Sequence, residues 1–264
     1  MTTEQNQAEV NYQKLFLEIR PQLSSYLYRL TANKQDMDDL LQDTYIKISD
    51  KISSFRGESS FKTWVFAVAT NLARDNRRVN NRWSADAQDK CRAAADASVD
   101  VQNRMLKAFA ELPEKRFEFA EHINYCFTCL GKNLSLEKQI SVILKEIFDF
   151  SRIEIAQILN VSEGTVKHLL HDGRKEIQEK FEYRCALINK QGACYQCAQL
   201  NDYFQEKKDA AEKVSALSIQ PQNTSDQNFT ERMKLIKLVD PVQGNGAKIE
   251  DTILQILRET IGDQ

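Results

Sequence analysis

The residues with the clearest chemical potential are two Cys-x-x-Cys pairs, Cys126 with Cys129 and Cys194 with Cys197. Two thiolates at this spacing can reach one metal ion, and two such pairs supply the four soft ligands of a tetrahedral zinc site. The pairs lie far apart in the chain, but a compact helical unit between them can bring them together. The sequence therefore predicts one structural zinc held by these four cysteines.

Two other uses of these thiols stay open. A thiol pair can form a disulfide reversibly and act as a redox switch, and cysteines also pack as small apolar side chains. Cys185 is a spare thiol or a further substitute ligand, and Cys91 lies in the expected linker and is not assigned to the site. No His or Ser stands at a nucleophile–base spacing, and the eight glycines form no phosphate-binding loop. The sequence therefore favours a protein that is not an enzyme.

A second pattern, between residues 151 and 180, is typical of a helix-turn-helix. Ile155, Ala156 and Leu159 are the apolar positions of a short helix, residues 160–162 form the turn, and Gly164 opens the next helix. Small residues let the two helix backbones approach closely, and Ser162 is the expected N-cap. An ordinary corner between two helices with solvated bases is the alternative. The second helix then offers to the outside the side chains of Lys167, His168, His171, Arg174 and Lys175.

The charges of the chain are segregated, although the net charge is only −2. Five aspartates lie between residues 36 and 50 with only Lys47 among them, and bases outnumber acids from Arg74 to Arg92. An acidic face followed by a basic one indicates one cationic and one polyanionic partner. Two solvated helix faces would give the same pattern.

These residues need a helical scaffold, and the composition agrees with one. The chain has 264 residues, of which 42% are hydrophobic, and few are Gly or Pro, so an all-α protein with two domains is expected. Apolar periodicity predicts helices over 11–30, over 36–52 with Asp36 as N-cap, and from Phe61 with Ser59 or Ser60 as N-cap. The third of these should bury Phe61, Trp64, Val65, Val68 and Leu72.

The remaining segments are assigned by composition and periodicity. Residues 83–102 are Ala-, Asp- and Gln-rich and indicate a flexible linker, and a second helical domain spans 103–183. A Cys-containing appendage follows over 184–204, and the tail over 205–264 combines a Ser/Gln/Asn-rich stretch with one amphipathic helix through residues 249–261. No apolar run approaches a membrane span, and no signal peptide is present, so we expect a cytoplasmic protein without membrane insertion.

Two motif sets together resemble a known family. The motif around Asp38-Asp39-Leu40-Leu41-Gln42-Asp43, followed by Phe61-Lys62-Thr63-Trp64 and Asn71-Leu72-Ala73, is similar to region two of bacterial extracytoplasmic-function (ECF) sigma factors of the sigma-70 family. The helix-turn-helix over 154–167 resembles their region four. The resemblance covers roughly residues 11–183, with region two over 11–82, and implies a subunit that directs RNA polymerase core to promoters.

The resemblance implies a role for each polar helix. The acidic helix would dock on the clamp helices of the polymerase largest subunits, the helix after Phe61 would open and bind the −10 element, and the helix after Ser162 would bind the −35 element. An anti-sigma factor is a further candidate partner. The implied core-binding residues are Asp36, Asp39, Leu40, Gln42 and Asp43, and the implied −10 residues are Asn71, Arg74, Arg77 and Arg78.

The chain departs from the family pattern in two ways. Many members have bases where this chain has Ala67, Thr70, Leu169 and Asp172, which predicts fewer phosphate contacts. An insertion over 114–135 also interrupts region four, and within it His122 precedes Cys126 in a His-x3-Cys-x2-Cys pattern that resembles zinc-binding anti-sigma factors, so His122 is a substitute ligand. A helix-turn-helix regulator that acts without polymerase, or a Cys-x-x-Cys redox protein, is the alternative function.

Overall fold

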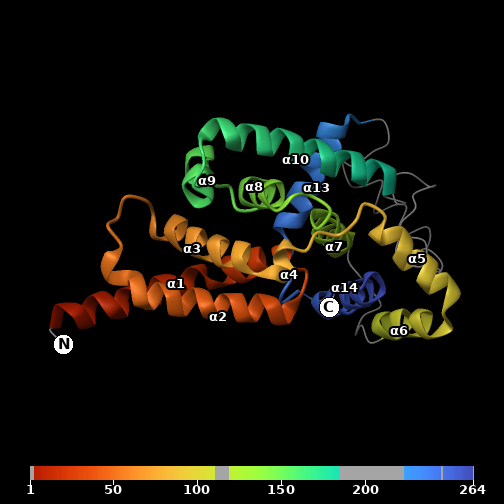
Figure 1. Ribbon diagram of the computed structural model, residues 1–264, viewed down its shortest axis with the longest axis horizontal. Coiled ribbons are helices and arrows are strands. Elements are labelled where there is room, and N and C mark those ends of the chain that lie inside the picture. Colours follow the sequence, from red (N-terminus) through yellow and green to blue (C-terminus); the bar gives the residue numbers. More distant parts are fainter. Residues whose placement is uncertain (1–2, 111–118, 185–222, 245, 264) are drawn as a thin grey trace.

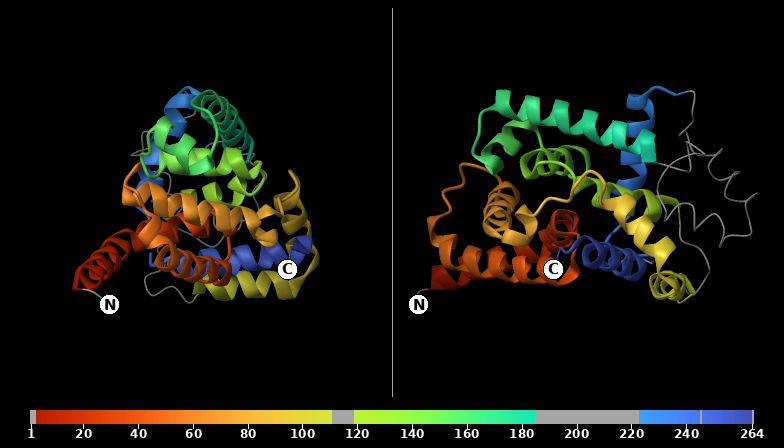
Figure 2. Two further views of the ribbon diagram at one scale, coloured as in Figure 1. Left: turned by 60° about the vertical axis from the view of Figure 1, so that its left-hand side comes forward. Right: turned by 45° about the vertical axis from the view of Figure 1, so that its right-hand side comes forward.

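The computed structural model describes residues 3–110, 119–184, 223–244 and 246–263, and every regular element within them is helical (Figure 1). Its helices form stacked layers. The two N-terminal helices make one outer layer, α3 lies above them, and the helix-turn-helix lies above α3 (Figures 1 and 2). The all-α class expected from the sequence is confirmed. The two domains, however, pack directly against each other.

Region two consists of α1 (Thr3–Thr31), α2 (Lys34–Lys51), the short 3-10 helix η1 (Ile52–Ser54), α3 (Phe61–Asp75) and α4 (Arg77–Asn80). Ser60 caps α3 as expected, because its side chain accepts a hydrogen bond from the Thr63 amide. The N-cap of α2 is Asn33, whose side chain accepts from the amides of residues 35 and 36. The expectation for Asp36 is therefore wrong: it lies inside the first turn and is buried.

The burial of α3 also differs from the expected pattern. Thr63, Val65, Phe66, Ala69, Thr70 and Ala73 are its buried residues, whereas Phe61, Trp64, Val68 and Leu72 are only partly buried. The reason is that α3 has neighbours on two sides, α1 and α2 below it and α9 above it. A helix covered on both sides buries more than the single apolar stripe that periodicity detects.

The segment expected to be a linker contains regular structure. It forms α5 (Ala87–Ala97) and, continuing beyond it, α6 (Val99–Ala110). Alanine is the strongest helix former, so an Ala-rich segment can be helical without a clear apolar period. Trp83, just before α5, is buried, and its amide donates to the carbonyl of Lys132.

Region four consists of α7 (Phe119–Gly131), α8 (Leu136–Glu146), α9 (Arg152–Leu159) and α10 (Glu163–Arg184). Ser151 and Glu154 form a capping box at the start of α9, and Asn160 ends that helix in the left-handed conformation with φ of 53°. The expected turn over 160–162 and the Ser162 cap are both present. The helix α7, from the predicted insertion, is mostly buried and contributes Ile123, Tyr125 and Phe127 to the core.

The tail adds α13 (Ser225–Lys237) and α14 (Ala247–Ile261). A capping box between Thr224 and Gln227 starts α13 inside the stretch expected to be flexible. The helix α13 packs on α7 and α10, and α14 packs on α5 and α6. The Cys appendage over 185–204 lies outside the described residues. Within the described part of the chain, no helix combines the length and the apolarity that a membrane crossing requires.

Candidate nucleic-acid interface

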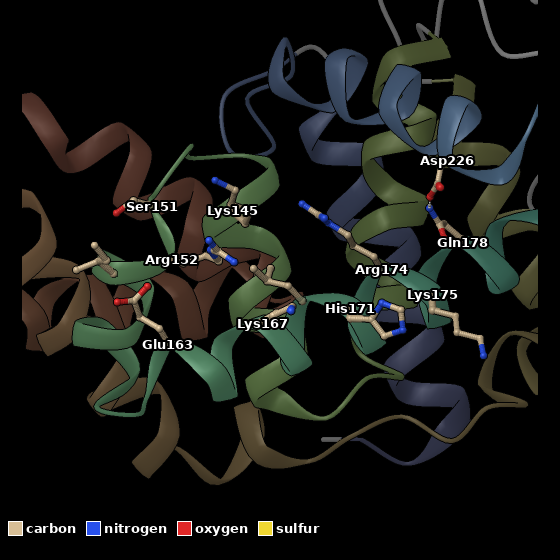
Figure 3. Close-up of a pocket in the computed structure, with 12 residues that line it drawn as sticks. Lys145, Ser151, Arg152, Glu163, Lys167, His171, Arg174, Lys175, Gln178 and Asp226 are labelled. Carbon is tan, nitrogen blue, oxygen red and sulfur yellow. Dashed lines mark hydrogen bonds between the residues drawn. The ribbon is translucent and has the colours of Figure 1, made fainter.

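A surface groove with a volume of about 930 Å³ lies on the helix-turn-helix. The end of α8, the start of α9 and the outer side of α10 form its walls (Figure 3). Bases outnumber acids along this groove, which suits the phosphate-lined surface of a nucleic acid. Its basic residues are Lys145, Arg152, Lys167, His171, Arg174 and Lys175, and its acidic residues are Glu163 and Asp226.

The residues expected to contact the −35 element lie at this groove with one exception. Lys167, His171 and Lys175 are exposed and line it, whereas His168 is exposed but is not part of the lining. Arg174 is only partly exposed, because its Nε donates to Glu146 Oε1 of α8 at 2.7 Å. Arg174 is therefore held by an acid of its own domain.

Two groove residues were not identified from the sequence. Arg152 is the first residue of α9, and Lys145 lies in the last turn of α8. Both residues line the groove, and the Lys145 ammonium donates to the Phe150 carbonyl at 3.3 Å. The signal for Arg152 was its position at the start of the first helix of the motif, where a base can reach a phosphate. Lys145 gave no such signal, because its helix precedes the motif.

The residues expected to contact the −10 element differ in their surroundings: the packing of α3 leaves some exposed and engages others within the molecule. Asn71 is exposed. Arg74 is instead engaged within the molecule: its Nη1 donates to the Leu159 carbonyl at the end of α9 at 3.1 Å, and its Nε lies 3.8 Å from Glu137. Arg77 and Arg78 belong to α4, and their side chains lie outside the described residues.

The contact between α3 and region four extends along the whole of α3. Thr63 Oγ1 donates to Glu154 Oε1 at 3.3 Å, and the Lys62 ammonium lies 4.8 Å from the centre of the Phe150 ring. Phe66 packs against Phe150 with the ring centres 5.0 Å apart. Burial lowers the pKa of Lys62, whereas Glu154 beside it raises that pKa. One side of α3 is therefore covered by α9 and the segment that precedes it.

The acidic helix α2 presents part of the expected core-binding set to solvent. Asp39, Gln42 and Asp43 are exposed, whereas Asp36 and Leu40 are 4% and 3% exposed. Ile46, one turn further along, is an exposed apolar residue at 49%. An acidic surface with an exposed apolar residue beside it suits a basic protein partner better than a nucleic acid.

The two thiols of α7 have different neighbours. Cys126 Sγ lies 3.7 Å from His122 Nε2, one helical turn away, whereas Cys129 is buried and accepts a hydrogen bond from Gln88 of α5 at 3.3 Å. Among the described residues, no group of three or more His, Cys, Asp or Glu side chains could hold a metal ion. Cys194 and Cys197 lie outside the described residues.

Comparison with known proteins explains why these surfaces occur together. Residues 15–83 match the family model for Sigma-70 region 2, and residues 129–177 match the model for Sigma-70, region 4. The chain is 31% identical over 156 residues to the ECF RNA polymerase sigma factor SigW of Bacillus subtilis, an alignment that covers 58% of this chain and 79% of SigW. The chain belongs to the ECF group of the sigma-70 family.

A second relative agrees with this membership. The chain is 26% identical to the ECF RNA polymerase sigma factor SigX of Bacillus subtilis, over 66% of this chain and 85% of SigX. A solved structure of the sigma factor RpoE with the anti-sigma factor NepR from Bartonella quintana aligns with 18% identity and a TM-score of 0.45, over 64% of this chain and 95% of that one. The chain is thus an RNA polymerase-binding sigma factor that directs transcription initiation, and neither alternative function is favoured. The two family models leave α5, α6, most of α7 and the tail unmatched.

Proposed function

We propose that this sigma factor binds the clamp helices of the polymerase largest subunits through the exposed side of α2. Asp39, Gln42 and Asp43 would make the contact, and the buried Asp36 and Leu40 would support the helix from below. The support for this proposal is the exposure of these acids on one side of a helix that is otherwise packed on α1 and α3. Because such a subunit works wherever the polymerase works, the proposal includes a cytoplasmic location.

Promoter contacts would come from the two polar helices named above. The groove on the helix-turn-helix would bind the −35 element, with Lys167, His171 and Lys175 directed at DNA and Arg152 and Lys145 at phosphates. The −10 element would be bound by α3 and α4 through Asn71, Arg74, Arg77 and Arg78. The observation that carries this proposal is the basic lining of the 930 Å³ groove, because basic side chains neutralise the phosphates of a DNA backbone.

Run-off transcription with core polymerase tests the core-binding part. Reversing Asp39 and Asp43 to Lys should weaken core binding about tenfold at low salt, because two exposed charge pairs contribute roughly 1 kcal/mol or less each. The same charge reversal at exposed Asp100 of α6 is the matched control. Unchanged affinity of the double variant would assign these aspartates to solvent.

DNA binding by the groove is tested separately. Arg152→Ala should weaken binding of −35 duplexes of every sequence alike and should reduce the salt dependence, as expected of a phosphate contact. Exposed Lys34 at the start of α2, far from the groove in the fold, provides the control Lys34→Ala. Equal losses of DNA affinity in Arg152→Ala and Lys34→Ala would show that binding depends only on the overall charge of the protein.

We also propose one structural zinc, with Cys126, Cys129, Cys194 and Cys197 as ligands and His122 as a substitute. The close approach of His122 and Cys126 supports a ligand pair on α7, and Cys129, Cys194 and Cys197 would complete the set. Because α7 already packs an apolar core, the metal would order the appendage more than α7 itself. Elemental analysis of protein kept reduced should find about one zinc, lost in Cys126→Ser; zinc-free protein would leave the redox switch as the better hypothesis.

An anti-sigma factor remains a proposed partner. Its support is the exposure of the α2 acids and of the −35 groove, since both surfaces are open to another protein. Co-purification from the native host, followed by a repeat with the Asp39 and Asp43 reversals, would identify such a partner and locate its contact.

A further inference from the structure

The tail touches both halves of the molecule. On one side, α13 lies on α7 and α10 of region four. On the other, the Arg258 guanidinium of α14 donates to the carbonyl of Ala32, the residue that follows α1. Asp263 accepts from the Trp83 indole at 2.5 Å and from the Asn81 amide at 2.5 Å, both at the end of region two.

A buried polar chain joins the same three parts through the centre of the molecule. Arg29 of α1 donates to Asn124 of α7 at 2.7 Å, and Asn124 donates to Glu250 of α14 at 3.1 Å. Arg29 also donates to the carbonyl of Val239, between α13 and α14, at 3.3 Å. The side chains of Arg29, Asn124 and Glu250 are each at most 1% exposed. Buried polar groups are costly when they lose their partners, so the three parts are held in one arrangement.

This arrangement is incompatible with simultaneous binding of the two promoter elements. The names of the elements place them roughly 25 base pairs apart, which is about 85 Å of DNA at 3.4 Å per base pair. In this structure α9 contacts both α3 and α10, so the two DNA-binding helices are separated by a single helix. Helices in contact have axes only about 8–10 Å apart. Moreover, Arg74 of α3 is bound to the end of α9.

We propose that the tail of α13 and α14 is an internal clasp that holds the sigma factor closed, with α9 covering one side of α3, and that promoter opening requires its release. The inference rests on the proposed −10 role of α3. The clasp is also placed to respond to polymerase. A groove of about 280 Å³ separates the end of α14 from the start of α2, and Asp36 of α2 and Arg258 of α14 both line it. A partner that covers the start of α2 therefore competes with the end of α14.

The test loosens the clasp at its outer contacts in the full-length chain. The variant Arg258→Ala/Asp263→Ala removes the links to Ala32, Asn81 and Trp83 and leaves the buried chain of Arg29, Asn124 and Glu250 intact. Thr252→Ala, which removes only a hydrogen bond to Lys248 within α14, is the matched control. Small-angle scattering measures the separation of the domains without polymerase, and run-off transcription measures promoter opening with it.

We expect the double variant to give a larger radius of gyration and several-fold more run-off product, while the control behaves as the parent protein. A larger radius with unchanged run-off would overturn the proposal, because release would then have no effect on promoter opening. An unchanged radius both in this variant and in Arg258→Ala/Asp263→Ala/Asn124→Ala, which also interrupts the buried chain, would overturn it as well, because the tail would then not hold the domains together. An absence of run-off from every variant, combined with expansion of the double variant, would contradict the promoter function and support the clasp.

Discussion

At the scale of single residues, Lys167 and Arg174 lie in the same groove but have different surroundings. Lys167 is exposed, whereas Arg174 is paired with Glu146. We expect Lys167→Ala to cost about 1–3 kcal/mol of DNA binding if it contacts a base, with no change in melting temperature. Arg174→Ala should weaken DNA binding and should also lower stability by up to about 1 kcal/mol, because Glu146 loses its partner.

Binding to a panel of −35 duplexes, together with thermal melting of each variant, distinguishes these outcomes. If Lys167→Ala lowers the affinity for every duplex of the panel by the same factor, Lys167 contacts a phosphate. Equal melting temperatures of both variants would show that the pair of Arg174 and Glu146 adds no stability.

Glu250 makes the clasp dependent on pH. Burial raises the pKa of Glu250 to about 8, although Asn124 and Arg29 lower it and Glu121 raises it further. A carboxyl with a raised pKa binds more protons in the folded state, so its contribution to stability falls as the pH rises from about 4.5 to about 8. Tail docking, followed by Trp83 fluorescence, should therefore weaken over this range. Glu250→Gln should flatten the profile, and an equally steep profile in that variant would assign the dependence to another group.

The features of the site that could be predicted from the sequence are those whose interaction partners lie close by in the chain. Ser60 and Ser162 were identifiable because a cap bonds to amides within three residues of itself. The role of Arg74 was not, because its partners Leu159 and Glu137 lie more than sixty residues away in the chain. Local patterns indicate which face of a helix is polar, but only packing shows whether that face meets solvent or another domain.

At the scale of elements, two glycines of α10 have opposite surroundings. A methyl group added at Gly164 would meet only Ser162 Oγ at 3.7 Å, whereas one at Gly173 would lie 2.8 Å from Val142 of α8. The close approach expected at the turn therefore occurs at Gly173. We expect Gly164→Ala to stabilise the protein by about 0.5–1 kcal/mol and Gly173→Ala to destabilise it by about 1–3 kcal/mol. Chemical unfolding of the two variants measures both, and a neutral Gly173→Ala would mean that α8 moves aside readily.

Two of the elements that sequence reasoning missed share a physical cause. Periodicity detects a helix by the contrast between its faces, and that contrast disappears when a helix is Ala-rich, as in α5, or buried nearly all round, as in α7. Both were assigned to a linker or an insertion for this reason. The helices of region two and the helix-turn-helix, which have one polar and one apolar face, were predicted.

At the scale of the whole molecule, the domains should unfold together. The Arg29–Asn124–Glu250 chain and the α3–α9 contact link region two, region four and the tail. We therefore expect one calorimetric transition for the parent protein, with equal calorimetric and van't Hoff enthalpies. Asn124→Ala should split or broaden this transition, because it interrupts the buried chain at its centre. Two resolved transitions in the parent protein would show that the domains are stable independently.

The order of the segments along the chain determines when the clasp can form during protein synthesis. The ribosome makes region two first, region four next and the tail afterwards, and domains fold as they emerge. At about 5–20 residues per second, the roughly forty residues of α13, α14 and their connection take several seconds to synthesise. During that interval a nascent molecule has both promoter-binding domains and no clasp. Closure is then a late maturation step, and each newly made sigma factor passes through a brief open period before it.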